Sequence, residues 1–186
     1  MAPRDEAVLV DMLHTSLVYD DGPVAIRYPR GNGLGVPLPS APTAIEIGTG
    51  EVLTRGDGSV ALLGYGTGVG LAQGAARLLA DQGISATVAD ARFAKPLDTE
   101  LINELAAEHE LLVTLEEGVL AGGFGAGVLE HLADHGLPVQ VMRVGLPDAY
   151  VTHGAPKLLH EEVGFTADAV ARRVSDRLAQ KTPTDA

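Results

Sequence analysis

The sequence predicts an α/β fold in which helices cover both faces of a mostly parallel sheet. From residue 46 onward, apolar strand-like runs alternate with helix-like segments, and the connections between them are short. Parallel strands require a crossover segment between them, and that segment is usually a helix. Aromatic residues make up only 4% of the chain and tryptophan is absent, so aliphatic side chains must build the core of the sheet.

Length and charge restrict the functional class. The 186 residues suffice for one sizeable core with an appendage. A formal net charge of −12 repels nucleic acid and anionic membrane surfaces. The chain has no cysteine for a disulfide or a thiolate metal site, and no apolar run approaches the roughly 20 residues of a membrane span. We therefore expect a cytoplasmic protein that binds neither nucleic acid nor a membrane.

Residues 1–31 resemble the end of a separate domain. A helix is predicted over 5–18, where apolar side chains recur at helical spacing, and a short strand over 24–26. The apolar stripe of that helix comprises Val8, Leu9, Met12, Leu13 and Leu17. One helix and one strand cannot bury themselves, so another domain or chain should cover this stripe. Residues 32–45 are rich in glycine and proline and predict an inter-domain linker.

Residues 46–186 form the predicted α/β domain. An edge strand over 46–53 turns at Arg55–Gly58 into a second strand over 60–63, which together make a hairpin. Aliphatic runs predict further strands over 86–89, 111–115 and 139–144. Apolar residues at helical spacing predict helices over 69–82, which Gly83 ends, and over 99–108, 125–134, 156–163 and 167–180.

The most informative motif is Arg27-Tyr28-Pro29-Arg30-Gly31, directly after the strand predicted over 24–26. Proline fixes its own φ angle and pushes Tyr28 toward extended geometry, so Arg30 leaves the strand in a defined direction. A guanidinium offers a planar fork of donors that suits a phosphate. A surface turn with solvated arginines explains the same residues, and both interpretations stay open.

Two glycine-rich loops precede predicted helices. Gly64–Gly70 follows a strand, and Asp90 ends the next strand, but the glycine spacing does not fit the dinucleotide fingerprint. We interpret this loop as a tight turn. Gly122–Gly127 follows Glu116 and Glu117, whose negative charge argues against an anion at that helix start. The glutamates should cap amides or pair with a basic group, with general acid–base catalysis by Glu116 as the alternative.

The histidines give weak signals. His131 and His135 share a helix face but lack the glutamate that accompanies such a pair in zinc hydrolases, so we expect them to be solvated. His153 lies beyond the carboxyl end of the last strand, where ligands of α/β proteins bind, although a turn-stabilising role is the simpler interpretation. The sequence contains no Ser-His-Asp order, metal cluster or Walker loop, so we expect no metal site in this chain.

Four sequence stretches together carry a family resemblance. They are DGPVAIRYPRGN (21–32), DARFAKPLD (90–98), LVTLEEGVLAGGFGAGVLE (112–130) and VGLPDAYVTHG (144–154). In order and spacing they resemble the C-terminal part of the 1-deoxy-D-xylulose-5-phosphate synthase family, which is transketolase-like. The glutamate pair and glycine-rich helix start are also similar to those of transketolases and 2-oxo acid dehydrogenase β subunits, which usually lack YPRG in this setting.

The resemblance implies a fold and an activity. Residues 46–186 would be a transketolase C-terminal-like domain, and residues 1–31 the end of a pyrimidine-binding domain. The family uses thiamine diphosphate and Mg²⁺ to condense pyruvate with glyceraldehyde 3-phosphate, which yields 1-deoxy-D-xylulose 5-phosphate and CO₂ for isoprenoid, thiamine and pyridoxal synthesis. Arg30 matches the family arginine that binds the acceptor phosphate, and Arg27 and Tyr28 are candidate supporting residues.

The cofactor motifs of the family are not found in this chain. Gly56-Asp57-Gly58 spells GDG but lies on the predicted hairpin turn, so the family's metal role is not carried over to it. We expect no catalytic or cofactor-binding residue here, and an inactive isolated chain that joins the N-terminal portion of the enzyme in a homodimer. The alternatives are a 2-oxo acid dehydrogenase β-like subunit and a non-catalytic module that binds an anion or a protein. The roles of Glu116, Glu117 and His153 stay open.

Overall fold

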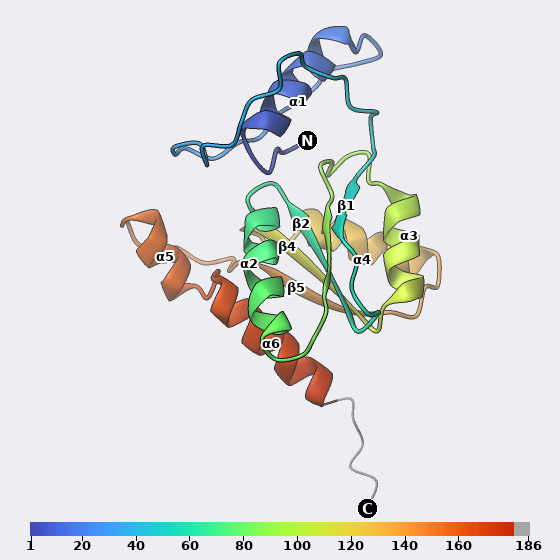
Figure 1. The fold of residues 1–186 in the computed structure, drawn as a ribbon, viewed down its shortest axis with the longest axis vertical. Helices are drawn as coiled ribbons and strands as arrows, with labels where there is room; N and C mark the ends of the chain where they lie inside the picture. Colours follow the sequence, from blue (N-terminus) through green and yellow to red (C-terminus); the bar gives the residue numbers. More distant parts are fainter. Residues whose placement is uncertain (181–186) are drawn as a thin grey trace, which may run out of the picture.

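The computed structural model describes residues 1–180, in which a five-stranded sheet carries an N-terminal segment at one end (Figure 1). The strand order is β1-β3-β2-β4-β5, and the last four of these strands are mutually parallel. The strands are β1 (Glu51–Thr54), β2 (Val60–Tyr65), β3 (Thr87–Asp90), β4 (Leu111–Val119) and β5 (Gln140–Leu146). The predicted mostly parallel sheet is therefore confirmed, with β1 as an antiparallel edge.

The predicted hairpin between the first two strands is wrong. β1 pairs with β3, with Glu51 opposite Asp90, so β3 lies between β1 and β2. The turn that follows β1 packs against the residues before β3. The amide of Asp57 donates to the Ser85 carbonyl at 2.9 Å, and a Cβ on Gly56 would lie 2.1 Å from the same oxygen. Glycine permits this close backbone approach, which places β1 at the free edge of β3.

Helices cover both faces of the sheet, as predicted (Figure 1). They are α2 (Gly68–Ala80) and α6 (Ala167–Ala179) on one face, α3 (Thr99–Glu108) and α4 (Phe124–Asp134) on the other, with α5 (Pro156–Glu162) before α6. Leu62 packs with the α2 and α6 residues and Leu63 with the α3 and α4 residues. Successive strand residues point to opposite faces, so strands buried on both sides appear as unbroken apolar runs.

The N-terminal segment contains one helix and no strand. The side chain of Asp5 caps α1 (Glu6–Val18) by accepting a hydrogen bond from the amide of Val8 at 2.8 Å. The strand predicted over 24–26 is wrong, because residues 19–50 contain no helix or strand. The ammonium of Met1 donates to the Ala25 carbonyl at 2.9 Å. This contact with the chain terminus does not amount to a strand pairing, so residues 24–26 do not become part of a sheet.

The apolar stripe of α1 is only partly covered within residues 1–180. Met12 is fully buried, whereas Leu13 is 49% exposed and Leu17 is 80% exposed. The predicted division of the chain into a domain end over 1–31, a linker over 32–45 and an α/β domain over 46–186 stays a prediction. Residues 181–186 of that α/β domain lie outside the described part of the chain.

Candidate functional site

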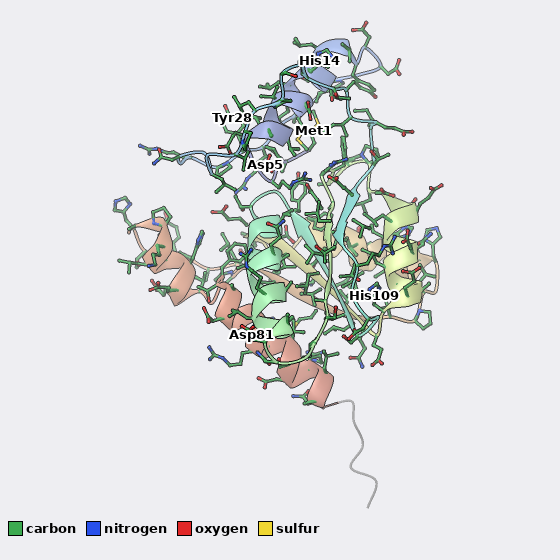
Figure 2. All side chains as sticks on the ribbon, in the orientation of Figure 1. Met1, Asp5, His14, Tyr28, Asp81 and His109 are labelled. Atoms are coloured by element: carbon green, nitrogen blue, oxygen red, sulfur yellow. The ribbon has the colours of Figure 1, made fainter. Side chains whose placement is uncertain are left out.

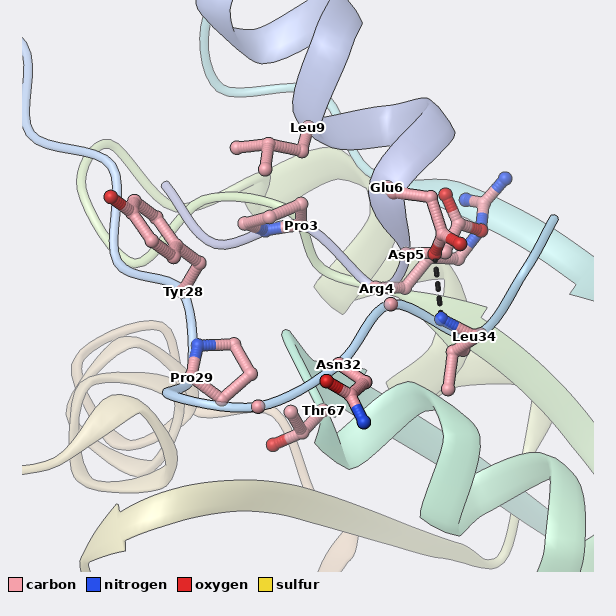
Figure 3. A pocket seen from close by; sticks show the side chains of 12 residues that line it. Pro3, Arg4, Asp5, Glu6, Leu9, Tyr28, Pro29, Asn32, Leu34 and Thr67 are labelled. Carbon is pink, nitrogen blue, oxygen red and sulfur yellow. Dashed lines mark hydrogen bonds and ion pairs between the residues drawn. The ribbon is translucent and has the colours of Figure 1, made fainter. Parts of the chain in front are cut away.

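The arginine turn borders a pocket of about 340 Å³ between the N-terminal segment and the β2–α2 loop. Its walls come from residues 3–6 and 9, residues 28, 29 and 31–34, and Thr67, so the neighbours of Arg30 line it. Figure 3 shows Tyr28 and Pro29 on one side of this pocket and Glu6 with Leu34 on the other. The carboxyl ends of the parallel strands lie at this end of the sheet, where open α/β sheets bind their ligands.

The structure separates the two arginines of the turn. Arg27 contacts the end of β4: its Nη2 donates to the Glu117 carbonyl at 2.9 Å, and its Nη1 lies 3.7 Å from Glu117 Oε2. Arg30 is exposed, and within residues 1–180 its guanidinium has neither a hydrogen bond nor an ion pair. Tyr28 is 62% exposed on the pocket wall. Arg27 thus fixes the start of the turn, while Arg30 is accessible to a ligand.

Glu117 joins three segments at the carboxyl end of β4. Its Oε2 accepts a hydrogen bond from Thr67 Oγ1 at 2.7 Å, and its Oε1 lies 3.2 Å from His160 Nε2 on α5. Arg27 is the third partner. Pairing of this glutamate with basic groups is confirmed. No motif pointed to His160, which contacts Glu117 from 43 residues away in the chain.

Glu116 caps α4 from the preceding strand. Its side chain is buried, with 4% of the residue exposed, and its two oxygens accept hydrogen bonds from the amides of Phe124 at 2.7 Å and Gly125 at 2.8 Å. The expected capping role is therefore confirmed. Because both oxygens bind amides of the helix start, the carboxylate already occupies the place an anion would take, and the acid–base alternative gains no support.

The first glycine-rich loop is a close-packed turn, as expected. A Cβ on Gly68 would lie 2.1 Å from the Leu115 carbonyl oxygen, and a Cβ on Gly64 would lie 2.5 Å from Val69 Cα. Gly66 adopts a φ angle of +58°. These glycines bring α2 against β4 and leave the dinucleotide alternative without support.

A network of charged side chains connects the N-terminal segment to the sheet. Arg4 Nη1 donates to Asp90 Oδ2 at 2.9 Å and to Glu51 Oε2 at 2.7 Å. Arg92 also bonds to Glu51, and its amide donates to Asp90 Oδ1 at 3.0 Å. Burial raises the pKa of Asp90, while Arg4 and the Arg92 amide oppose that shift. Sequence reasoning considered Asp90 only as a nucleotide ligand and missed Arg4, whose partners lie 47 and 86 residues away.

The three histidines considered in the sequence, His131, His135 and His153, differ in their contacts. His131 Nε2 lies 2.8 Å from Asn103 Oδ1, and His135 Nδ1 lies 2.8 Å from the His131 carbonyl. Burial and the neighbouring His135 lower the pKa of His131. His135 is solvent-exposed as expected, whereas His131 is partly covered. His153 is exposed in its loop, and the structure gives it no partner within residues 1–180.

Sequence reasoning also missed the buried His109, which lies at the other end of the sheet from the N-terminal segment (Figure 2). Its Nε2 lies 2.7 Å from Thr87 Oγ1 and its Nδ1 lies 3.0 Å from the Leu105 carbonyl. Both ring nitrogens therefore have partners in the core, which indicates a structural role.

The residues that the structure describes do not fit a magnesium diphosphate site. Across residues 1–180, no group of three His, Cys, Asp or Glu side chains could hold a metal ion. The carboxylate of Asp57 accepts hydrogen bonds from the amide of Ser59 at 3.0 Å and from its hydroxyl at 2.7 Å, so it stabilises its own turn.

In the same part of the chain, no helix has the length and apolar character needed to cross a membrane.

Known sequences match almost the whole chain. The profile of the family described as "Transketolase, C-terminal domain" matches residues 48–170. The 1-deoxy-D-xylulose-5-phosphate synthase of Acaryochloris marina (strain MBIC 11017) is 52% identical over 182 residues, which cover 97% of this chain and 28% of that protein. The synthase of Heliobacterium modesticaldum (strain ATCC 51547 / Ice1) is 51% identical over 172 residues, covering 92% of this chain and 26% of that protein. The chain thus spans little more than a quarter of these relatives.

Two solved structures share the fold. One, described as a split gene transketolase in an inactive β4 tetramer, has a TM-score of 0.84 and 34% identity, and the match covers 97% of this chain and 58% of that chain. A transketolase mutant from Pichia stipitis has a TM-score of 0.53 and 19% identity, with coverage of 72% and 18%, and shows the fold alone.

Proposed function

The chain belongs to the transketolase C-terminal domain family, and we propose that it is the C-terminal portion of a 1-deoxy-D-xylulose-5-phosphate synthase. The complete enzyme would condense pyruvate with glyceraldehyde 3-phosphate to form 1-deoxy-D-xylulose 5-phosphate and CO₂. The observation that carries this proposal is the 52% identity over 97% of the chain to a protein of that name. The relatives favour a synthase over a 2-oxo acid dehydrogenase β subunit.

In this proposal Arg30 binds the phosphate of the acceptor substrate. Its guanidinium is exposed at a turn that borders a pocket, and no ion pair within residues 1–180 competes for it. A planar guanidinium forms paired, charge-assisted hydrogen bonds with phosphate oxygens. Arg30 would therefore hold and orient the acceptor, while thiamine diphosphate and Mg²⁺ would bind to other parts of the enzyme.

We further propose that the chain alone is inactive and acts with the N-terminal portion of the enzyme, within a homodimer. The exposed Leu13 and Leu17 on α1 support this, because apolar side chains grouped on a helix face favour a covering partner. The split gene transketolase offers a parallel, since its β chains are described as an inactive tetramer.

The test uses a complete enzyme, hereafter the chimeric synthase, in which this chain replaces the aligned residues of the Acaryochloris marina relative. Hydrogen bonds to charged groups contribute about 1.5–3 kcal/mol each. Arg30→Ala should therefore reduce the stabilisation of the transition state with glyceraldehyde 3-phosphate by about 2–4 kcal/mol, which lowers kcat/KM for this acceptor roughly 30- to 700-fold. Arg30→Lys should recover part of this loss, because lysine keeps the charge without the planar fork.

The matched control is Arg177→Ala, which removes an exposed arginine on α6. Steady-state kinetics with unphosphorylated D-glyceraldehyde provide the second control, since that acceptor has no phosphate group for Arg30 to contact. Equal losses with both acceptors would show that Arg30 supports the turn rather than the phosphate, and the assignment would be withdrawn.

A further inference from the structure

The carboxylate of Glu6 binds three consecutive backbone amides of the segment that follows the arginine turn. The amide of Leu34 donates to Oε2 at 3.0 Å, and the amides of Gly35 and Val36 donate to Oε1 at 2.5 and 3.0 Å. Figure 3 shows the first of these bonds reaching from Leu34 across the pocket edge to the start of α1. One side chain thus fixes three residues that lie 28 to 30 positions away in sequence.

The chain passes so close to Glu6 that a side chain at position 33 would displace the carboxylate from its present place. A Cβ on Gly33 would lie 2.8 Å from Glu6 Oε1, and Gly35 has a φ angle of +81°. Hydrogen bonds from its own amide and from residues 34–36 lower the pKa of Glu6, so at neutral pH it is an ionised acceptor. The glycines of this segment are therefore matched to the carboxylate that binds it.

These contacts fix the arginine turn on both sides. Arg27 bonds to the Glu117 carbonyl before the turn, and Glu6 binds the amides after it. Arg30 lies midway between the two fixed points. A loop held at both ends has less conformational entropy to lose when one of its side chains binds a ligand, so its affinity is higher than that of a free loop.

We propose that Glu6 is a positioning residue for Arg30, whose carboxylate holds the outgoing segment of the turn so that the guanidinium is preorganised for the acceptor phosphate. This role rests on the proposed function of Arg30. It predicts that loss of Glu6 weakens binding of the phosphorylated acceptor, seen as a higher KM, and leaves kcat unchanged.

The first experiment measures amide hydrogen exchange by NMR in this chain. Glu6→Ala should raise the exchange rates of the amides of residues 34–36, because these amides lose their hydrogen-bond acceptor and open to solvent more often. Glu6→Gln keeps one acceptor oxygen and should give an intermediate increase. Asp11→Asn is the matched control on the same helix, because Asp11 binds the amide of Thr43 further along the linker. Unchanged exchange of residues 34–36 in Glu6→Ala would overturn the proposal.

The second experiment measures kinetics of the chimeric synthase. Glu6→Ala should raise KM for glyceraldehyde 3-phosphate by about five- to twentyfold, with kcat and the KM for D-glyceraldehyde unchanged. Residues that act as one unit give non-additive effects, so Glu6→Ala should add nothing in an Arg30→Ala background. Additive losses, or equal losses with both acceptors, would refute the positioning role.

The outcomes separate this inference from the proposed function. If Arg30→Ala has a phosphate-specific effect and Glu6→Ala has none, the positioning role falls and the proposed function stands. If Arg30→Ala itself lacks a phosphate-specific effect, both fall, whatever the exchange rates of the isolated chain show.

Discussion

Replacing Glu116 should destabilise the α/β domain in graded steps. The carboxylate accepts hydrogen bonds from the amides of Phe124 and Gly125, one on each oxygen, in a buried environment. Glu116→Ala removes both acceptors. Glu116→Gln keeps the shape and one carbonyl oxygen, but its amino group then faces a backbone amide that also donates.

The structure sets the size of the effect. A hydrogen bond to a charged group contributes about 1.5–3 kcal/mol, so the loss of two gives about 3–6 kcal/mol as an upper range. Water that enters the space left by Glu116→Ala would bind the freed amides and reduce this cost. We therefore expect about 3 kcal/mol for Glu116→Ala and about half of that for Glu116→Gln.

Urea unfolding followed by circular dichroism measures these differences in the free energy of unfolding. In thermal unfolding, about 3 kcal/mol corresponds to a decrease in Tm of roughly 6–12 °C for a chain of this size. Glu130→Ala is the matched control, because Glu130 is exposed on the same helix. A loss below about 0.5 kcal/mol for Glu116→Ala, which is typical of surface substitutions, would refute the capping account.

Two further predictions concern the turn after β1 and the segment held by Glu6. Gly56→Ala would place a Cβ 2.1 Å from the Ser85 carbonyl oxygen, so urea unfolding should show a loss of about 1–3 kcal/mol, whereas Gly70→Ala, with open space around it, should show none. Because the pKa of Glu6 is lowered, its contacts form above its ordinary value of 4.5 and are lost only as the pH falls through the lower folded value. The NMR shifts of the 34–36 amides should therefore titrate below pH 4.5; a midpoint at or above it would contradict this.

Local chemistry in the sequence was sufficient to predict most elements. α3 has the predicted bounds of 99–108, because Asp98 caps it by accepting from the amide of Leu101 at 2.9 Å. The core strands were predictable because burial on both faces requires unbroken apolar runs. The position of Glu116, directly before a glycine-rich helix start, predicted its capping role.

Features that depend on distant partners were not predictable. The turn at Gly56 indicated a chain reversal, but local sequence cannot show that β3 would lie between the two strands. The network of Arg4 with Asp90 and the binding of residues 34–36 by Glu6 join groups that no motif or spacing relates. A surface turn and a phosphate site both place Arg30 in solvent, and the kinetics of Arg30→Ala distinguish the two.

The central claim is that this chain contributes the C-terminal portion, with its acceptor arginine, to a thiamine-diphosphate-dependent synthase. The most direct measurement is formation of 1-deoxy-D-xylulose 5-phosphate from pyruvate and glyceraldehyde 3-phosphate, detected by mass spectrometry with thiamine diphosphate and Mg²⁺ present. We predict product from the chimeric synthase, far less from its Arg30→Ala variant, and none from the isolated chain. Turnover by the isolated chain, or a folded chimeric synthase that binds cofactor and forms no product, would contradict the claim.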